Sequence, residues 1–301
     1  MKHLYYSTLV ILAVSCLLLF SCDRKPPEPT VITFNVSALE LVEGETAHLE
    51  VTITPARQAQ NFSWSSSNIL VATIDDRGNN ATVNAHRAGT SAIRVTTPDG
   101  TRRSVQATVI PANSVYIDGR FWARSNVNEP GHFANNPEDA GMFFQWNRKI
   151  GWSATTPGLF EPIDEWDNFF TFVLSTSWDL ENDPCPEGWR VPTGQEWRSL
   201  MSQNYFWTNH NGATGKMFGT WPNQIFIPAA GLRQLMDGAL HGVGTNAFYW
   251  SRSRIAGDTP GVEMFAAAFW FRAPPILPNQ EMNLNSMHQT AGLSIRCIHD
   301  N

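Results

Sequence analysis

The stretch from Cys185 to Met201, CPEGWRVPTGQEWRSLM, limits what this chain can fold into more than any other part of it. Thr193 and Glu196 are three residues apart, which predicts a capping box: the threonine hydroxyl accepts the backbone N–H of Glu196, and the carboxylate reaches back to the helix start. Val191 precedes a proline, so the chain before the helix should be extended. Three apolar side chains then share one helical face by their spacing: Trp197, Leu200 and Met201. We expect residues 115–301 to be built around this short amphipathic helix.

Length and charge set the broad class of the protein. The chain has 301 residues, which is enough for about two domains. Its hydrophobic content of 42% and charged content of 16% are typical of a globular protein with packed cores. The formal charge is −6 and no basic run occurs, so nucleic acid is not an expected partner.

Residues 1–22 have the pattern of an export signal. Lys2 is followed by an apolar run, Leu9 to Phe20, which is too short and too early for an ordinary membrane span. Cys22 follows the small Ser21, and this order resembles a bacterial lipoprotein box, which implies cleavage before Cys22 and acylation of its thiol. A plain secretory signal cut nearby is the alternative. The lipid would anchor the protein in the cell envelope, and we expect the outer membrane, with exposure at the cell surface left open.

Residues 23–30, DRKPPEPT, are a polar, proline-rich linker that should act as a stiff spacer. After it, residues 31–112 show short alternating runs and no sustained helical periodicity. We expect an antiparallel sandwich of two sheets, with Trp64 in its core. The clearest strands are expected at residues 31–36, 47–53, 92–96 and 105–110.

Residues 31–112 also resemble the bacterial Ig-like group 2 family. The resemblance is carried by four segments: Leu41 to Gly44, Phe62 to Asn68, Val71 to Asp75 and Ala88 to Ile93. It covers nearly all of this part of the chain. Membership implies a spacer or adhesive module at the cell surface and supplies no catalytic residues.

The composition changes again beyond residue 112, because every tryptophan except Trp64 lies between Phe121 and Phe271. Strands are expected here at residues 224–233, interrupted by Pro228, and at residues 247–251, 264–272 and 293–298. Residues 141–146 should form a buried strand or a tight aromatic turn. We expect long loops between them, at residues 204–223, 234–246 and 273–291. Loops of this length inside a compact domain are usually functional.

Residues 115–299 resemble the Fibrobacter succinogenes major paralogous (FISUMP) domain. The resemblance is carried chiefly by the block from Cys185 to Trp197, with the order C-P-x-G-W-R-V-P-T-x-x-E-W, and by the close from Gly292 to Cys297. The family is grouped with C-type-lectin-like folds, which implies an α+β domain with a loop-rich surface. Its members are bacterial surface or secreted proteins of largely undefined role, so the resemblance implies an architecture and leaves the function open.

Cys185 and Cys297 are expected to form a disulfide. Export implies an oxidising compartment, Cys16 leaves with the signal, and Cys22 would be acylated, so these two cysteines are the remaining partners. Two buried free thiols are the alternative.

No catalytic centre, metal site or cofactor site is predicted. Residues 190–197 resemble a segment of formylglycine-generating enzymes, but the reactive cysteine pair that those enzymes need is missing. The histidines show neither H-E-x-x-H nor the short spacings of a zinc site. The acidic stretch 161–167, EPIDEWD, offers oxygens for Ca²⁺, but a solvated acidic loop explains it better.

Aromatic and amide side chains in the expected loops are the candidates for ligand binding. Exposed aromatic faces stack on sugar rings or clamp partners, whereas buried ones supply core area. We expect a core role for Trp146, Trp189, Trp197 and Trp250. The candidate binding residues are Trp207, Asn209, Asn211, Trp221 and Asn246.

The sequence therefore predicts an envelope-anchored surface lipoprotein in which an Ig-like stalk carries a non-catalytic recognition head. The head would bind a glycan or a partner protein. Two alternatives stay open: a hydrolase or modifying enzyme acting on envelope polymers, and a structural subunit of a surface assembly.

Overall fold

The computed structural model describes residues 28–155, 166, 173–254, 264–275 and 281–300. The predicted signal with Cys22, most of the linker, and the acidic stretch 161–167 apart from Trp166 lie outside the described residues. The chain divides into two compact units, one formed mostly by residues up to Val109 and the other mostly by residues from Ile110 onward.

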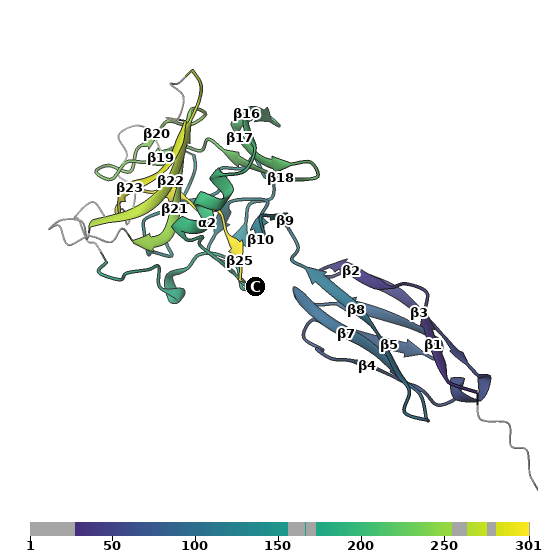
Figure 1. Ribbon diagram of the computed structural model, residues 1–301. Coiled ribbons are helices and arrows are strands. Elements are labelled where there is room, and N and C mark those ends of the chain that lie inside the picture. Colours follow the sequence, from purple (N-terminus) through teal and green to yellow (C-terminus); the bar gives the residue numbers. More distant parts are fainter. Residues whose placement is uncertain (1–27, 156–165, 167–172, 255–263, 276–280, 301) are drawn as a thin grey trace, which may run out of the picture. The chain divides into compact units, whose positions relative to one another are not determined.

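The first unit is a β-sandwich, as the alternating sequence pattern predicted. Two four-stranded sheets have the orders β1-β3-β6-β5 and β2-β8-β7-β4 (Figure 1). The strands are β1 (Val31–Phe34), β2 (Ala38–Val42), β3 (Thr46–Thr54), β4 (Ser63–Ser66), β5 (Ala72–Arg77), β6 (Asn80–Ala85), β7 (Gly89–Thr96) and β8 (Arg102–Ile110), with a 3₁₀ turn at Ala56–Ala59.

Alternation along the strands fills the core of this sandwich. In β3, every second residue from Leu49 to Ile53 is buried, because successive side chains point to opposite faces of a strand. Trp64 is half-buried and packs against both apolar clusters of the unit, while its Nε1 donates to the carbonyl oxygen of Gly78 at 3.0 Å. The predicted core tryptophan therefore lies where the two clusters meet.

The described residues of the second unit form five sheets, with the orders β14-β13-β24-β21-β22-β23, β15-β25-β10-β9, β16-β17-β18, β11-β12 and β19-β20. Its first strands are β9 (Ser114–Ile117), β10 (Arg120–Ala123), β11 (Val127–Glu129), β12 (His132–Phe133), β13 (Phe143–Phe144), β14 (Gly151–Trp152) and β15 (Trp189–Arg190). They are followed by β16 (Tyr205–His210), β17 (Ala213–Thr220), β18 (Asn223–Pro228), β19 (Leu232–Arg233), β20 (Leu240–His241), β21 (Asn246–Arg254), β22 (Phe265–Arg272), β23 (Met282–His288), β24 (Leu293–Ser294) and β25 (Ile298–His299). In the described part of the chain, α2 (Gly194–Met201) is the one α-helix, and a 3₁₀ turn covers Leu180–Asn182.

Helix α2 begins at the predicted capping box. The Thr193 hydroxyl accepts the backbone N–H of Glu196 at 3.2 Å, and a Glu196 oxygen accepts the backbone N–H of Thr193 at 2.8 Å. Trp197 and Leu200 are fully buried and Met201 is half-buried against the same cluster, so the predicted apolar face is the one that docks.

The predicted disulfide joins Cys185 to Cys297, with the two Cα atoms 6.0 Å apart. It ties the segment before α2 to the segment before β25. The bond closes a loop with a sequence separation of 112 residues. Chain-entropy arguments give such a cross-link about 4–5 kcal/mol of stabilisation, by restricting the unfolded chain.

Two of the long loops expected from the sequence are strands instead. Residues 204–223 contain β16, β17 and the turn into β18, and residues 273–291 contain β23. The reason at β16 and β17 is a two-residue turn: Asn211 and Gly212 have φ of 48° and 93°, and Asn-Gly in this conformation favours a tight hairpin. The expected closing strand 293–298 is also broken in two, because β24 and β25 pair in different sheets.

The capping box carries a charge pair that links stability to pH. Arg190 donates two hydrogen bonds to Glu196, Nη1 to Oε2 at 2.8 Å and Nη2 to Oε1 at 2.6 Å. Burial alone raises the pKa of the Glu196 carboxyl, but the hydrogen bonds from Arg190 and Thr193 outweigh it and lower the pKa from 4.5 to about 2. A folded-state pKa below the ordinary value means that the carboxylate stabilises the fold above pH 4.5 and loses this effect as pH falls through about 2.

We therefore expect Glu196→Gln to lower the free energy of unfolding by about 1–2 kcal/mol at pH 7, less than the full pKa shift implies, because solvent screens the charge pair and Gln keeps part of the capping box. The gap between the variant and the native chain should shrink as the pH falls from 4.5 to about 2. Urea unfolding at a series of pH values measures this gap. Glu187→Gln, an exposed carboxyl outside the capping box, is the matched control. A gap that stays constant down to pH 2 would contradict the assigned role of the carboxylate.

Candidate functional site

The three-stranded sheet β16-β17-β18 has two different faces. Phe218 and Ile225, which pair across β17 and β18, are buried in the main apolar cluster of the second unit. Met217 and Phe226 also pair directly, and because successive side chains alternate, they lie on the opposite face. That second face borders a hollow, which is our candidate functional site.

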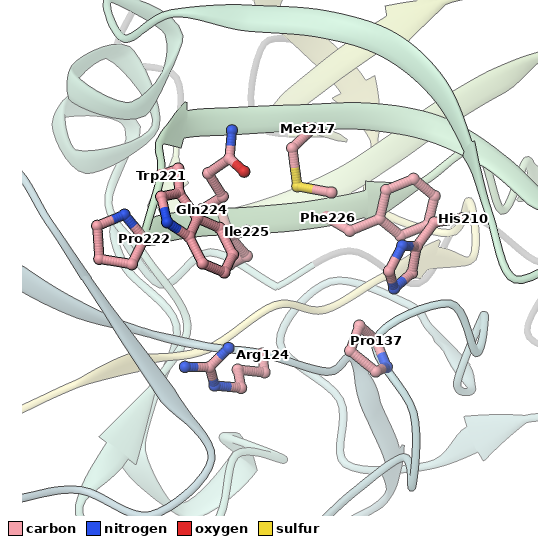
Figure 2. Close-up of a pocket in the computed structure, with 9 residues that line it drawn as sticks. All are labelled: Arg124, Pro137, His210, Met217, Trp221, Pro222, Gln224, Ile225 and Phe226. Carbon is pink, nitrogen blue, oxygen red and sulfur yellow. The ribbon is translucent and has the colours of Figure 1, made fainter.

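The hollow has a volume of about 180 Å³. In Figure 2, Arg124 and Pro137 form one wall, and residues of the three-stranded sheet and its turns form the other. The lining residues are Arg124, Pro137, His210, Met217, Trp221, Pro222, Gln224, Ile225 and Phe226. Most of this surface is apolar, with a few polar groups at its edges, which is the usual character of a ligand site.

Trp221 lies in the turn between β17 and β18, at the rim of the hollow (Figure 2). Its side chain is 82% exposed, whereas tryptophan in folded proteins is highly buried on average. Trp221, one of the candidate binding residues, is therefore presented to solvent. Gln224 lies beside it on β18, with its amide among the lining groups.

Arg124 supplies the positive charge of the opposite wall. It follows β10, and its backbone is fixed at both ends: its N–H donates to the carbonyl oxygen of Asn113 at 2.9 Å, and its own carbonyl accepts from the buried guanidinium of Arg296. Its side chain is exposed, and no hydrogen bond or ion pair joins its guanidinium to another residue in the described ranges.

His210 and Pro137 close the end of the hollow away from Trp221. The His210 ring packs on Phe226 with ring centroids 5.1 Å apart, and its Nε2 lies 4.0 Å from Oε2 of Glu138. Asn211 donates to the other oxygen of Glu138 at 2.9 Å, and this hydrogen bond lowers the pKa of the Glu138 carboxyl. The segment that carries Pro137 is thereby held against the β16–β17 hairpin.

The five predicted binding residues do not come together in one site. Trp221 lines the hollow, while Asn211 holds Glu138 beside it and Asn209 accepts the backbone N–H of Gly212 within the hairpin turn. Trp207 is half-buried on the core-facing side of β16, where its ring meets Phe271 edge-on at 6.0 Å. Asn246 is half-buried at the start of β21, where its backbone bonds to two glycines.

Of the four tryptophans expected in the core, three are fully buried: Trp146, Trp197 and Trp250. Trp189 is half-buried, with its ring edge-on to those of Phe133 and His299.

Most residues that line the hollow could not be identified from the sequence. Arg124 and Pro137 are far from β17 and β18 along the chain, and no local pattern links them. His210 carries no motif that would mark it, because the histidines show neither H-E-x-x-H nor the short spacings of a zinc site. The one available signal was the Asn211-Gly212 turn, because it fixes the hairpin whose outer face carries Met217 and His210.

The side chains that line the hollow limit the chemistry that it can support. Its nine lining residues include no carboxylate, thiol or hydroxyl group, so it holds no ordinary nucleophile, and His210 is its one candidate acid or base. Within the described ranges, no group of three or more His, Cys, Asp or Glu side chains is placed to hold a metal ion. No helix there is both long enough and apolar enough to cross a membrane.

The two loop tryptophans should differ sharply in their effect on stability. Trp207→Ala should lower the free energy of unfolding by about 2 kcal/mol, somewhat less than for a fully buried ring, because its ring packs on Phe271. Trp221→Ala should change it by less than about 0.5 kcal/mol, as for other exposed positions. Chemical denaturation of both variants measures the difference. Equal losses would show that Trp221 is packed rather than presented to solvent.

Comparison with known proteins identifies part of the chain. No curated protein matches it. Among solved structures, domains 4 and 5 of the S-layer protein SbsC share 18% identity over 27% of this chain and 51% of that one, with a TM-score of 0.24. The BIgI domain of the beta protein from S. agalactiae, bound to CEACAM1, shares 13% sequence identity, and the match covers 28% of this chain and 98% of that one with a TM-score of 0.19. Yersinia pseudotuberculosis adhesin InvE shares 11% sequence identity, and the match covers 86% of this chain and 58% of that one with a TM-score of 0.25. The chain thus spans about half of the SbsC fragment. Residues 29–109 match the family model "Bacterial Ig-like domain (group 2)", so this part of the chain is such a domain.

Proposed function

We propose that this protein is a surface recognition protein. Its second unit binds a ligand non-covalently in the hollow beside Trp221 and catalyses no reaction on it. The observation that carries the proposal is the indole of Trp221, which is 82% exposed at the rim of the hollow. An exposed indole beside an apolar hollow that has a few polar groups offers a contact surface for a ligand.

The polar groups of the hollow are suited to orienting a ligand. The Arg124 guanidinium, the Gln224 amide and the His210 imidazole surround an apolar floor and offer both donors and acceptors. A few such groups around apolar walls fix the orientation of a bound molecule. The lack of a nucleophile in the lining supports recognition over hydrolysis.

We propose the finer architecture on sequence grounds. The second unit is a FISUMP domain with a C-type-lectin-like fold, supported by the block from Cys185 to Trp197 and the close from Gly292 to Cys297. The disulfide between Cys185 and Cys297 is compatible with this proposal, since it joins these two motifs. The Ig-like domain then serves as a stalk, and the lipid on Cys22 as the anchor.

The binding role predicts a selective effect of Trp221→Ala. Purified protein from residue 23 onward is applied to an array of defined oligosaccharides and extracted envelope polysaccharides. The native chain should bind a subset of them, and Trp221→Ala should lose at least about tenfold in affinity for that subset, because a tryptophan that anchors a contact typically contributes about 2 kcal/mol or more.

Tyr116→Ala is the matched control, because Tyr116 is also an exposed aromatic residue but does not line the hollow. It should bind as the native chain does. Equal losses in the two variants would remove the hollow from the proposal. Degradation of a polysaccharide by the native chain would favour the enzyme alternative.

The anchor gives a separate prediction. Cells expressing the full chain are labelled with a fatty-acid probe, and the label should appear on the native protein, since Cys22 stands at the end of the apolar run. Cys22→Ala should abolish the label and release the protein from the membrane fraction. Cys16→Ala, which changes a cysteine inside the signal, should keep the label. Labelling that persists in Cys22→Ala would rule the anchor out.

A further inference from the structure

We propose that the ligand of the hollow is an acidic sugar, with its carboxylate paired to Arg124 and its ring stacked on Trp221. This inference rests on the proposed function and deepens it. Its first support is the distribution of charge. Residues 110–301 contain 12 Lys and Arg and 18 Asp and Glu, so this part of the chain carries the whole formal charge of −6. The lining of the hollow contains the bases Arg124 and His210 and no acidic side chain.

Arg124 has the chemistry to hold a carboxylate. Its planar guanidinium presents paired N–H groups that match the two oxygens of a carboxylate, and such charge-assisted pairs are stronger than neutral hydrogen bonds. Its side chain has no ion-pair partner among the residues described by the structure, so a ligand need not displace one. Its backbone is fixed by hydrogen bonds to Asn113 and Arg296. The backbone therefore loses little conformational entropy when a ligand binds.

Size and shape favour a single sugar ring. The volume of about 180 Å³ is below the roughly 300–1,000 Å³ of sites for drug-sized ligands, so one ring fits better than an extended segment. Trp221 offers an open, flat indole on the wall opposite Arg124 (Figure 2). The apolar C–H face of a sugar would stack there, while Gln224 and His210 offer hydrogen bonds to its hydroxyls.

The floor of the hollow argues against an apolar peptide side chain as the occupant. Phe226 is only 3% exposed, because the His210 ring already packs on it. The largest apolar ring of the floor therefore has little area left to bury, whereas the exposed indole at the rim offers a platform. A peptide carrying a terminal carboxylate remains the competing ligand that the experiment has to distinguish.

The test uses calorimetry on the protein from residue 23 onward with three probes: an oligosaccharide of glucuronic acid, a neutral glucose oligosaccharide of the same length, and a dipeptide with a free carboxylate. The acidic oligosaccharide should bind at least about tenfold more tightly than the neutral one. Arg124→Gln should reduce that preference to about twofold or less, and Arg124→Lys should keep part of it. Added salt should weaken binding of the acidic probe to the native chain.

Arg198→Gln is the matched control, because Arg198 is an exposed arginine outside the hollow and its replacement changes the net charge equally. It should leave the preference unchanged. Equal binding of the two oligosaccharides, an Arg124→Gln variant that keeps the preference, or binding of none of the probes would each overturn the inference. Binding of the dipeptide alone, sensitive to Arg124→Gln, would overturn it in favour of a peptide. If Trp221→Ala still abolishes binding to a neutral polysaccharide, the proposed function stands and only the acidic class fails.

Discussion

The burial of Trp197 is the packing interaction on which the second unit depends most. Its side chain is 0% exposed and packs on the rings of Trp122 at 5.1 Å, Tyr249 at 5.8 Å and Phe269 at 4.6 Å. Its Nε1 donates to the carbonyl oxygen of Trp250 at 3.1 Å, so the polar atom is also satisfied. One side chain thereby joins α2 to strands of two different sheets. The capping box acts through this contact, because fixing the first turn of the helix fixes the direction in which Trp197 points.

Arg296 connects the core of this unit to the hollow. It is fully buried and forms no ion pair within the described residues; its guanidinium instead donates to the side chain of Asn126 and to the carbonyl oxygens of Ala123 and Arg124. Burial lowers its pKa to about 10, which leaves it charged at neutral pH. A buried charge is costly unless it is hydrogen-bonded, so Arg296 depends on these three acceptors, which bind its Nε and Nη1. The backbone of Arg124 is therefore held by the core, which fixes the point from which its side chain extends beside the hollow.

The parts of the structure that the sequence could predict are those with local or compositional signals. The capping box depends on two residues three apart, the sandwich on short-range alternation, and the disulfide on the small number of available cysteines. Strands β16 and β17 were predicted as a loop, although the Asn211-Gly212 turn favours a hairpin, whereas β18 lies largely within the strand expected at residues 224–233. The hollow could not be predicted, because Arg124 and Pro137 meet Trp221 only after the hairpin packs against the segment from Arg124 to Glu138.

The two faces of this hairpin sheet explain why composition could not separate the core tryptophans from the exposed ones. Trp207 stands inside a strand at a core-facing position, so alternation buries part of it against Phe271. Trp221 stands in a turn, where no neighbouring strand covers it. A slip of one residue in the pairing of β16 with β17 would send Trp207 to the outer face and His210 to the core face. The Asn211-Gly212 turn prevents that slip, because a two-residue hairpin fixes the register of both strands. Which side chains face the core and which face the hollow thus depends on the two turn residues, which line neither the main apolar cluster nor the hollow.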